Sequence, residues 1–307
     1  MSSMQHMQDH RAALIAQCPP APAPLSAADA ATRPIHVKRL GATGPAVLFI
    51  HGGVQGGLGG GATTFVRQEA LAEQGWQLRL ADRPGFGQSP SRGVDDMMAD
   101  APWIADLLGD GAHLVGHSWG GAEALLAAAR RPEAVRSLIL VEPAMQPLLM
   151  TDPTALNDAT KADAGRLGAA LMAAQSPREY GLAFARSLGT FDTGGRGPNP
   201  IAALEADPEK ATSAGCALLQ GRMASPDLMK RAAEAVARAH IPVLVITGGW
   251  SPTFDAGGDL AAQLTGGRHV IVRSPNHFPQ LANATEFNIT VDAFMREADR
   301  ARPAGTK

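Results

Sequence analysis

The sequence is poor in cysteine, the residue type that covalently staples small or secreted proteins. Only two of its 307 residues are cysteines, Cys18 and Cys216. Two cysteines cannot staple a chain of this size, and such sparse use is typical of a reducing compartment. We therefore expect neither cysteine to have a role beyond packing, and we expect a cytoplasmic protein.

A surplus of charge of one sign and long apolar runs are also missing. The 27 basic residues nearly balance 29 acidic ones, which leaves a formal net charge of -2. No basic surface is therefore expected to attract nucleic acid. No apolar run approaches the roughly 20 residues that cross a bilayer, and the first residues lack the basic and long apolar stretches of a secretion signal. Nucleic acid and membrane are both excluded as expected partners.

The first 34 residues have the composition of a tail or linker. Residues 19–34, PPAPAPLSAADAATRP, consist of proline, alanine and small polar residues, which bury too little apolar surface to offset the entropy lost on ordering. A short helix before this stretch is compatible with the pattern. We expect residues 1–34 to be a flexible tail, and residues 301–307 to be a second one.

From residue 46, short apolar runs alternate with glycine-rich turns and amphipathic stretches. Near-continuous apolar runs are typical of parallel strands that are buried on both faces. The pattern predicts a parallel α/β sheet with helices on both faces, with helices near 64–73, 97–108 and 122–130. The expected strands are residues 46–50, 77–81, 113–115, 135–141, 242–247 and 270–273.

Strand signals stop between residues 146 and 240. Helical patterns rich in alanine, leucine and methionine replace them. We interpret 146–240 as an inserted helical domain, between the two parts of an α/β core at 35–145 and 241–300.

The most informative stretch is residues 113–121, HLVGHSWGG, where an apolar run leads into the pattern G-x-S-x-G. A sharp turn from strand to helix needs small residues on both sides of the serine, so that a strained backbone can lift its hydroxyl above the sheet edge. The helix that follows directs free amides toward charge that develops beside that oxygen. Ser118 is the candidate nucleophile.

A second motif, HGG at residues 51–53, follows the strand at 46–50. Glycine lets the backbone pass close to a substrate with its N–H group free. The amides of Gly53 and Trp119 could form the two-donor hole that an acyl oxyanion needs. We expect the His51 ring to brace the turn and not to transfer protons.

Two further glycine-bearing stretches invite other interpretations. Residues 57–62 match G-x-G-x-x-A, with Asp82 about twenty positions further on, as in a dinucleotide fingerprint. The match falls in a loop saturated with glycine, so we give it little weight. Residues 82–89, DRPGFGQS, predict a rigid loop at the sheet edge, in which Asp82 and Arg83 tie the turn and Phe86 lines a pocket.

His277 lies in the loop SPNHF, after the last predicted strand. Serine is a weak nucleophile until a base takes its proton, and histidine titrates in the range that this requires. The other histidines lie in the tail or beside strands. His277 is therefore the candidate base.

Taken together and in this order, HGG, DRPGFGQS, GHSWGG and NHF resemble the α/β-hydrolase family, over most of residues 40 to 300. The resemblance implies a mostly parallel sheet of about eight strands with the insert as a cap domain, and substrate bound between the two. It also implies that Ser118 is the nucleophile, His277 the base, and Gly53 and Trp119 the oxyanion donors.

The third member of the implied triad departs from the family pattern. Relatives carry a carboxylate a few residues after the strand that precedes the last one, where this chain has Ser251. A serine cannot stabilise an imidazolium as a buried carboxylate does. Glu142, at the end of the strand at 135–141, is the favoured substitute, and Asp255 is the alternative, although it could instead cap a helix.

A serine nucleophile argues for attack on a carbonyl group, where related dehalogenases attack carbon with aspartate. We expect hydrolysis of a small to medium apolar ester, lactone or thioester, without metal or cofactor. Amide or carbon–carbon bond hydrolysis would use the same residues, and Ser251 motivates a non-hydrolytic, ligand-binding alternative. The sequence is also compatible with a homodimer. Candidate pocket residues are Phe86, Trp250, Phe278 and Met145.

Overall fold

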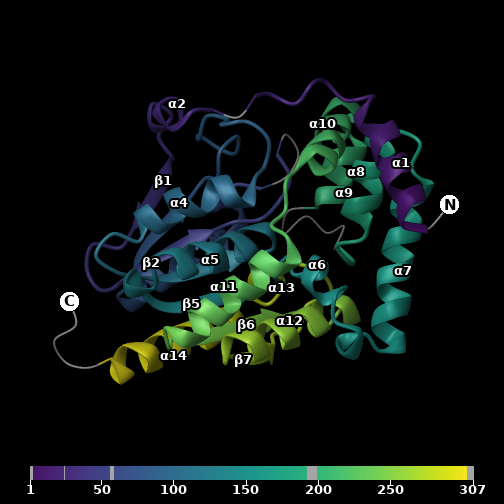
Figure 1. Cartoon of the computed structure of the whole chain (residues 1–307). Helices are drawn as coiled ribbons and strands as arrows, with labels where there is room; N and C mark the ends of the chain where they lie inside the picture. Colours follow the sequence, from purple (N-terminus) through teal and green to yellow (C-terminus); the bar gives the residue numbers. More distant parts are fainter. Residues whose placement is uncertain (1–2, 24, 56–58, 192–198, 303–307) are drawn as a thin grey trace.

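A computed structural model describes residues 3–23, 25–55, 59–191 and 199–302. Within these residues the core is a seven-stranded sheet with the order β1-β3-β2-β4-β5-β6-β7 (Figure 1). β1 is antiparallel to β3, and every other neighbouring pair is parallel. The strands are β1 (Val37–Leu40), β2 (Ala46–Ile50), β3 (Gln77–Ala81), β4 (Ala112–His117), β5 (Val135–Val141), β6 (Val243–Thr247) and β7 (Arg268–Ile271).

The predicted fold class is confirmed, but two details of the strand assignment are wrong. The described residues form seven strands where about eight were expected, because the chain before Val37 contains helices and a proline-rich segment. The last strand covers Arg268–Ile271, two residues earlier than the apolar pattern at 270–273 indicated.

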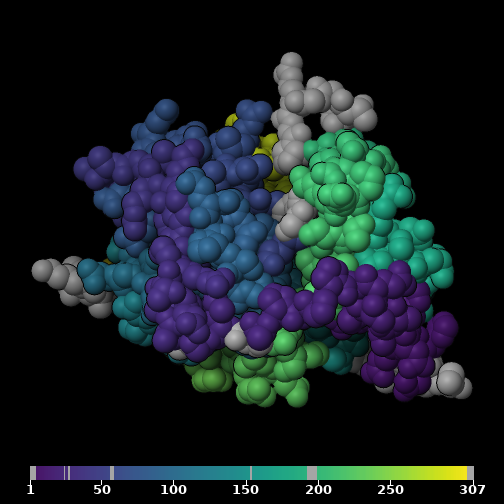
Figure 2. Space-filling view, turned by 90° about the horizontal axis from the view of Figure 1, so that it is seen from above, coloured from purple at the N-terminus to yellow at the C-terminus, as the bar shows by residue number. Residues whose placement is uncertain are grey.

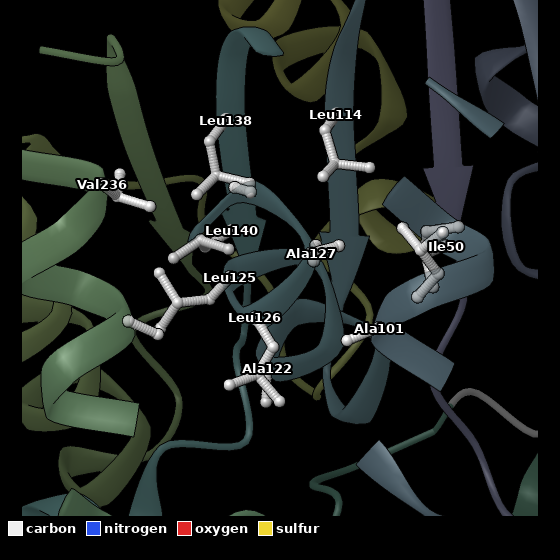
Figure 3. Close-up of a cluster of buried hydrophobic side chains, with 14 of the residues drawn as sticks. Ile50, Ala101, Leu114, Ala122, Leu125, Leu126, Ala127, Leu138, Leu140 and Val236 are labelled. Carbon is white, nitrogen blue, oxygen red and sulfur yellow. The ribbon is translucent and has the colours of Figure 1, made fainter. Parts of the chain in front are cut away.

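Side chains that alternate along the strands bury both faces of the sheet. In β2, Leu48 and Ile50 join one apolar cluster, and Val47 and Phe49 join the other. Helices α4 (Met97–Leu107), α5 (Trp119–Arg130), α11 (Pro226–Arg238) and α12 (Pro252–Thr265) contribute to the first cluster (Figure 3). The 3-10 helix η1 (Val66–Gln74) and α14 (Ala284–Ala301) contribute to the second.

The remaining helices lie before the sheet, in the insert or as short segments between or after the strands. The helix expected at 64–73 is divided between α3, which ends at Thr64, and η1. The other described helices are α1 (Ser3–Ile15), α2 (Ala27–Ala31), α3 (Gly61–Thr64), η2 (Pro132–Ala134), α6 (Gln146–Leu149), η3 (Pro153–Ala155), α7 (Asp158–Ala173), α8 (Pro177–Arg186), α9 (Pro200–Glu205), α10 (Pro208–Gln220) and α13 (Pro279–Ala282).

Helices α7 to α10 form a group beside the sheet (Figure 1). Val54, just after β2, packs against this group through Leu182, Ala211 and Ala214. Helix α11, which the domain prediction placed in the cap, instead packs on α5 and α12 and contributes to the core cluster. None of the described helices is long and apolar enough to cross a membrane.

The N-terminal residues are attached to the insert by a disulfide. Cys18 is bonded to Cys216 of α10, with their Cα atoms 5.6 Å apart. The prediction that neither cysteine has a role beyond packing is therefore wrong. Two cysteines that are 198 positions apart carry no pairing signal in the sequence. Because they form a disulfide, their small number no longer argues for a reducing compartment.

The carboxyl ends of the central strands meet at one edge of the sheet. Ile50 of β2 pairs with Gly116 of β4, His117 pairs with Val141 of β5, and Val141 pairs with Ile246 of β6. The residues that follow these strands are therefore neighbours in space. This register brings the HGG loop, Ser118, Glu142 and the loop after β6 to the same edge.

Candidate active site

Ser118 occupies a strained turn between β4 and α5. Its backbone angles are φ 58° and ψ −122°, in a region that residues with a side chain rarely adopt. The turn is fixed on both sides: the Ser118 amide donates to the Val141 carbonyl at 2.8 Å, and its own carbonyl accepts from the Ala144 amide at 3.0 Å. The half-buried serine is thus held in place at the sheet edge.

The glycines around Ser118 are required by close backbone approach. A Cβ on Gly116 would lie 2.4 Å from the Gly120 carbonyl oxygen, and a Cβ on Gly120 would lie 2.4 Å from that of His51. A Cβ on Gly52 would lie 2.5 Å from the Cβ of Ser118. The HGG loop is therefore packed directly against the candidate nucleophile.

His51 supports this loop, as expected. One ring nitrogen, Nδ1, lies 2.6 Å from the Gly52 carbonyl, and the other, Nε2, accepts a bond of 2.9 Å from the Arg83 amide. Burial lowers the pKa of His51 to about 3. A neutral ring with both nitrogens engaged braces the turn.

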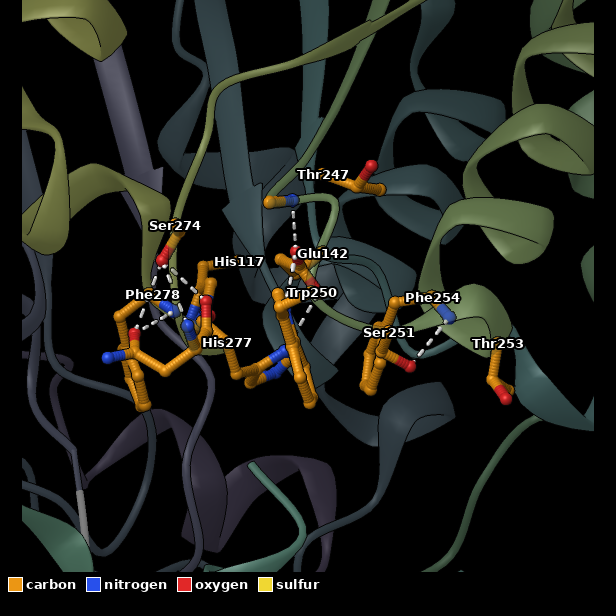
Figure 4. Close-up of polar contacts among 12 residues, drawn as sticks. His117, Glu142, Thr247, Trp250, Ser251, Thr253, Phe254, Ser274, His277 and Phe278 are labelled. Carbon is orange, nitrogen blue, oxygen red and sulfur yellow. Dashed lines mark hydrogen bonds and ion pairs between the residues drawn. The ribbon is translucent and has the colours of Figure 1, made fainter. Parts of the chain in front are cut away.

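His277 lies in the loop after β7, and its ring is buried. Its Nδ1 is 3.1 Å from Oε2 of Glu142 (Figure 4). Its backbone amide donates to the Leu188 carbonyl of the insert at 2.9 Å. Burial lowers the pKa of His277 to about 3. The imidazole is therefore neutral, the form that can accept a proton.

Glu142 follows β5 with a φ of 45° and has no exposed surface. Its Oε1 accepts a hydrogen bond of 2.6 Å from the Gly248 amide and one of 3.1 Å from Nε1 of Trp250. Burial raises the pKa of the Glu142 carboxyl to about 8, although both of these hydrogen bonds act in the opposite direction. The remaining oxygen, Oε2, faces His277.

Ser251, which occupies the position where relatives carry the acid, and Asp255, the alternative acid, have different partners. The Ser251 hydroxyl caps α12 and donates to Oδ2 of Asp163, on α7, at 2.5 Å. Asp255 accepts from the Thr247 hydroxyl at 2.5 Å and from the Gly249 amide at 3.3 Å. Of the two carboxylates weighed from the sequence, the structure brings Glu142 to His277.

Aromatic rings surround His277. The ring of Phe254, which the sequence analysis did not select, lies 4.5 Å from that of His277, and the rings of Phe278 and Trp250 lie 5.7 and 6.1 Å away. Phe86 packs instead on His51, with ring centroids 4.8 Å apart. Met145, expected in the pocket, is fully buried in the core cluster on the α5 face.

Sequence reasoning also missed His117, the residue before Ser118. Its Nε2 donates a 2.8 Å hydrogen bond to the His277 carbonyl, and the two rings are 4.9 Å apart. Its Nδ1 is buried without a partner in the described residues, and burial lowers the pKa of His117 well below its usual value. The position directly before the nucleophile, at the end of a strand, was the available signal.

The second omission is a buried ion cluster around Arg83. Nη2 of Arg83 donates to Oδ1 of Asp95 at 2.8 Å and to Oε1 of Glu123 at 2.9 Å, and Asp100 lies 3.5 Å from Nε. Glu123 also accepts a 2.8 Å bond from Nε1 of Trp119. The cluster therefore holds the side chain that follows Ser118.

The dinucleotide pattern falls partly outside the described residues, and Asp82 has a local role in its loop. Gly57 and Leu58 of the dinucleotide pattern lie outside the described residues. Asp82 accepts hydrogen bonds from the amides of Gly61 and Gln88, at 2.8 and 3.0 Å, so it ties the loop as expected. Among the described residues no three histidine, cysteine, aspartate or glutamate side chains are grouped as metal ligands.

Comparison with known proteins gives consistent matches. The family model described as "alpha/beta hydrolase fold" matches residues 45–284. A pimeloyl-[acyl-carrier protein] methyl ester esterase of Aeromonas salmonicida is 36% identical over 111 residues, which are 35% of this chain and 41% of that protein. A 2-hydroxy-6-oxononadienedioate/2-hydroxy-6-oxononatrienedioate hydrolase of Comamonas testosteroni is 36% identical over 36% of this chain and 40% of that protein.

These alignments span about two fifths of the length of the curated relatives. Similarity of fold extends further. The structure of an esterase from Exiguobacterium antarcticum superimposes with a TM-score of 0.59 at 17% identity, over 85% of this chain and 95% of that one.

Proposed function

Because this chain belongs to the α/β hydrolase fold family, we propose that it is a serine hydrolase in which Ser118 is the nucleophile, His277 the base and Glu142 the acid. The observation that carries this proposal is the 3.1 Å contact between Nδ1 of His277 and Oε2 of Glu142. The contact lies next to the serine turn, because His117, the neighbour of Ser118, is hydrogen bonded to the His277 backbone.

The proposed reaction begins when Nε2 of His277 takes the proton of the Ser118 hydroxyl. The serine oxygen attacks the substrate carbonyl, and the Glu142 carboxylate stabilises the imidazolium that forms. His277 then protonates the leaving group. Water, activated by the same ring, releases the acid product from the acyl-enzyme.

The oxyanion of the tetrahedral intermediate needs two free N–H donors. Among the described residues, neither the Gly53 amide nor the Trp119 amide donates a hydrogen bond. Gly53 has a φ of 96° and follows Gly52, which packs on Ser118. Trp119 is the first residue of α5, where helix geometry leaves the amide unpaired. Both amides are therefore suited to this role.

We propose an apolar carboxylic ester, lactone or thioester as the substrate, since aromatic rings surround His277. Names of the matched relatives support an ester first, and hydrolysis of a carbon–carbon bond second. The non-hydrolytic alternative was motivated by Ser251. The contact of Glu142 with His277 offers a carboxylate for this role, which supports hydrolysis over the non-hydrolytic alternative.

A fluorophosphonate probe followed by peptide mass spectrometry tests this proposal. We expect covalent labelling of Ser118 in the wild type and none in Ser118→Ala. A panel of 4-nitrophenyl esters, an anilide and a vinylogous diketone separates ester, amide and carbon–carbon bond hydrolysis. A folded wild-type protein that remains unlabelled would contradict the serine-hydrolase assignment.

A further inference from the structure

The N-terminal strap, defined as residues 16–23, is fixed to the insert at several points. The Cys18–Cys216 disulfide attaches it to α10. Nη2 of Arg11, in α1, donates to the Leu219 carbonyl of α10 at 2.6 Å, and Nε2 of Gln220 donates to the Pro19 carbonyl at 2.7 Å. The N-terminal segment, which comprises α1 and the strap and continues to Arg33, is therefore attached to the insert at its first end.

The other end of this segment is attached to the core. Arg33 donates to the Ser91 carbonyl, and Arg92 donates to the Arg33 carbonyl, each at 2.5 Å. In the space-filling view, the purple N-terminal segment extends from the green insert to the blue core (Figure 2). The described residues among the first 34, which were expected to form a flexible tail, thus connect the two parts of the molecule.

A cavity of about 710 Å³ lies beneath the strap. The strap contributes Pro19, Pro20 and Pro22 to its wall, and α10 contributes Cys216 and Ala217. The loops after β2 and β3 complete the wall, among others through Gln55. The disulfide therefore forms part of the cavity, and the strap is its outer wall.

The composition of the wall indicates which ligand would fit. Proline and alanine side chains offer apolar contact, and Gln55 and Thr212 offer uncharged hydrogen-bonding groups. The ionisable side chains of this wall are two carboxyls, Asp95 and Glu209, beside the disulfide-bonded Cys216. An uncharged apolar chain is favoured over an anionic one.

The cavity lies close to the candidate nucleophile. Gln55 is three residues after Gly52, so their Cα atoms are at most about 11 Å apart. Gly52 itself packs against the Cβ of Ser118. Val54, between them, packs on Ala211 and Ala214 of α10, the helix that forms the opposite wall. No residue of the candidate site is among those that line the cavity, so a chain attached to a carbonyl at Ser118 reaches it by passing this loop, where the buried Val54 packs on α10.

We propose that this cavity binds the apolar chain of the ester substrate, and that the Cys18–Cys216 disulfide holds the strap in place as its wall. The inference rests on the proposed hydrolase function and adds to it a chain-length preference and a sensitivity to thiols. A dithiol such as dithiothreitol would reduce the disulfide to two cysteine thiols and would itself be oxidised to a cyclic disulfide. The strap would then keep its hydrogen bonds to Gln220 of α10 and to the Gln175 carbonyl.

The first experiment compares 4-nitrophenyl octanoate with 4-nitrophenyl acetate. We expect reduction, or Cys18→Ser, to raise KM for the octanoate about fivefold and to leave the acetate unchanged. Peptide mapping without reductant should recover Cys18 linked to Cys216 after treatment with oxidised glutathione. Absence of that linkage, or equal effects on both esters, would overturn the role of the disulfide.

The second experiment fills the cavity. Ala217→Trp should lower kcat/KM for the octanoate about tenfold, with little effect on the acetate. The matched control, Ala169→Trp, alters an exposed position of α7 that is not part of the cavity wall. Equal octanoate rates in the two variants would overturn the assignment of the cavity.

Binding of N-phenyl-1-naphthylamine, an uncharged apolar fluorophore, separates the two proposals. We expect Ser118→Ala to bind it, Ser118→Ala/Ala217→Trp to bind it at least fivefold more weakly, and the anionic 8-sulfonate analogue to bind poorly to both. If the wild type is not labelled by fluorophosphonate but this pattern holds, the hydrolase function fails and the cavity stands. If Ser118 is labelled but the fluorophore does not bind, the cavity proposal fails alone.

Discussion

Two buried groups of ionisable side chains lie beside the Ser118 turn, and they differ in the basic side chain that faces the carboxyl groups. In the first, Glu142 faces His277 at 3.1 Å. In the second, Glu123 faces Arg83, with Nε and Oε2 2.8 Å apart. Histidine can lose its charge at neutral pH, whereas arginine cannot.

This difference in partner is visible in the pKa values. Burial alone would lower the pKa of Arg83, but Asp95, Glu123 and Asp100 outweigh it and raise that pKa. Burial lowers the pKa of His277, and no nearby carboxylate reverses the direction. The Arg83 cluster therefore keeps a permanent charge that fixes structure, and the Glu142–His277 pair keeps a base that can take up a proton.

The largest expected effect on activity is that of Glu142→Gln. The amide keeps the size of the side chain but cannot stabilise an imidazolium, so kcat should fall by roughly 10³–10⁴. Asp255→Asn is the matched control, because Asp255 bonds to Thr247 and not to His277. Steady-state kinetics measure both. A larger loss in the Asp255 variant would reverse the assignment of the acid.

Glu142→Gln should also preserve the fold. Folding raises the pKa of this carboxyl to about 8, so the folded state binds more protons than the unfolded state. The carboxyl therefore makes the protein less stable as the pH rises from the ordinary pKa of a glutamate toward 8. The variant should therefore melt at or above the wild-type temperature at pH 9. A lower melting temperature would mean that the lost activity reflects unfolding.

Substitution in the Arg83 cluster should lower the stability of the fold, in contrast to Glu142→Gln. Arg83→Met leaves Asp95, Asp100 and Glu123 buried without their cation, which should cost about 3–5 kcal/mol in the free energy of unfolding. Arg238→Met, at an exposed position of α11, should cost less than about 1 kcal/mol. Urea denaturation measures both values. Equal free energies of unfolding in the two variants would show that the Arg83 cluster does not stabilise the fold.

Much of the sheet was predictable, because its strands are buried on both faces. The runs at 46–50, 77–81 and 135–141 coincide with β2, β3 and β5. Such strands leave continuous apolar runs that no surface helix would have. β7 has partly exposed residues, so its apolar signal was weaker and its position was shifted.

The candidate site was predictable where it depends on the ends of strands. Ser118, Glu142 and the HGG loop each follow a parallel strand, and parallel strands place their carboxyl ends at one edge. Contacts between distant segments left no such signal. The Cys18–Cys216 bond and the Arg83 cluster depend on how the insert and the loops after β3 and β4 pack, which no local pattern encodes.

The pH dependence of kcat tests the titratable partner directly. In the proposed mechanism the ionised Glu142 carboxylate stabilises the imidazolium and the protonated carboxyl does not, and burial raises its pKa to about 8. The ionised fraction, and with it kcat, should therefore rise about tenfold between pH 7 and pH 9. Glu142→Gln should lose this rise. A wild-type profile that is flat over this range would show that the carboxyl is already ionised at neutral pH.

The smallest expected effect is that of His117, which positions His277 through one hydrogen bond to its carbonyl. His117→Leu leaves that buried carbonyl without a donor, a loss of about 1 kcal/mol or more, and we expect kcat to fall about fivefold with KM unchanged. His117→Gln, whose amide can donate to the same carbonyl, should restore most of kcat. A purely structural role would instead lower the melting temperature of both variants and leave kcat of the folded protein unaffected. Measuring kcat and the melting temperature together therefore decides whether His117 acts with the Glu142–His277 pair or only stabilises the fold, as the Arg83 cluster does.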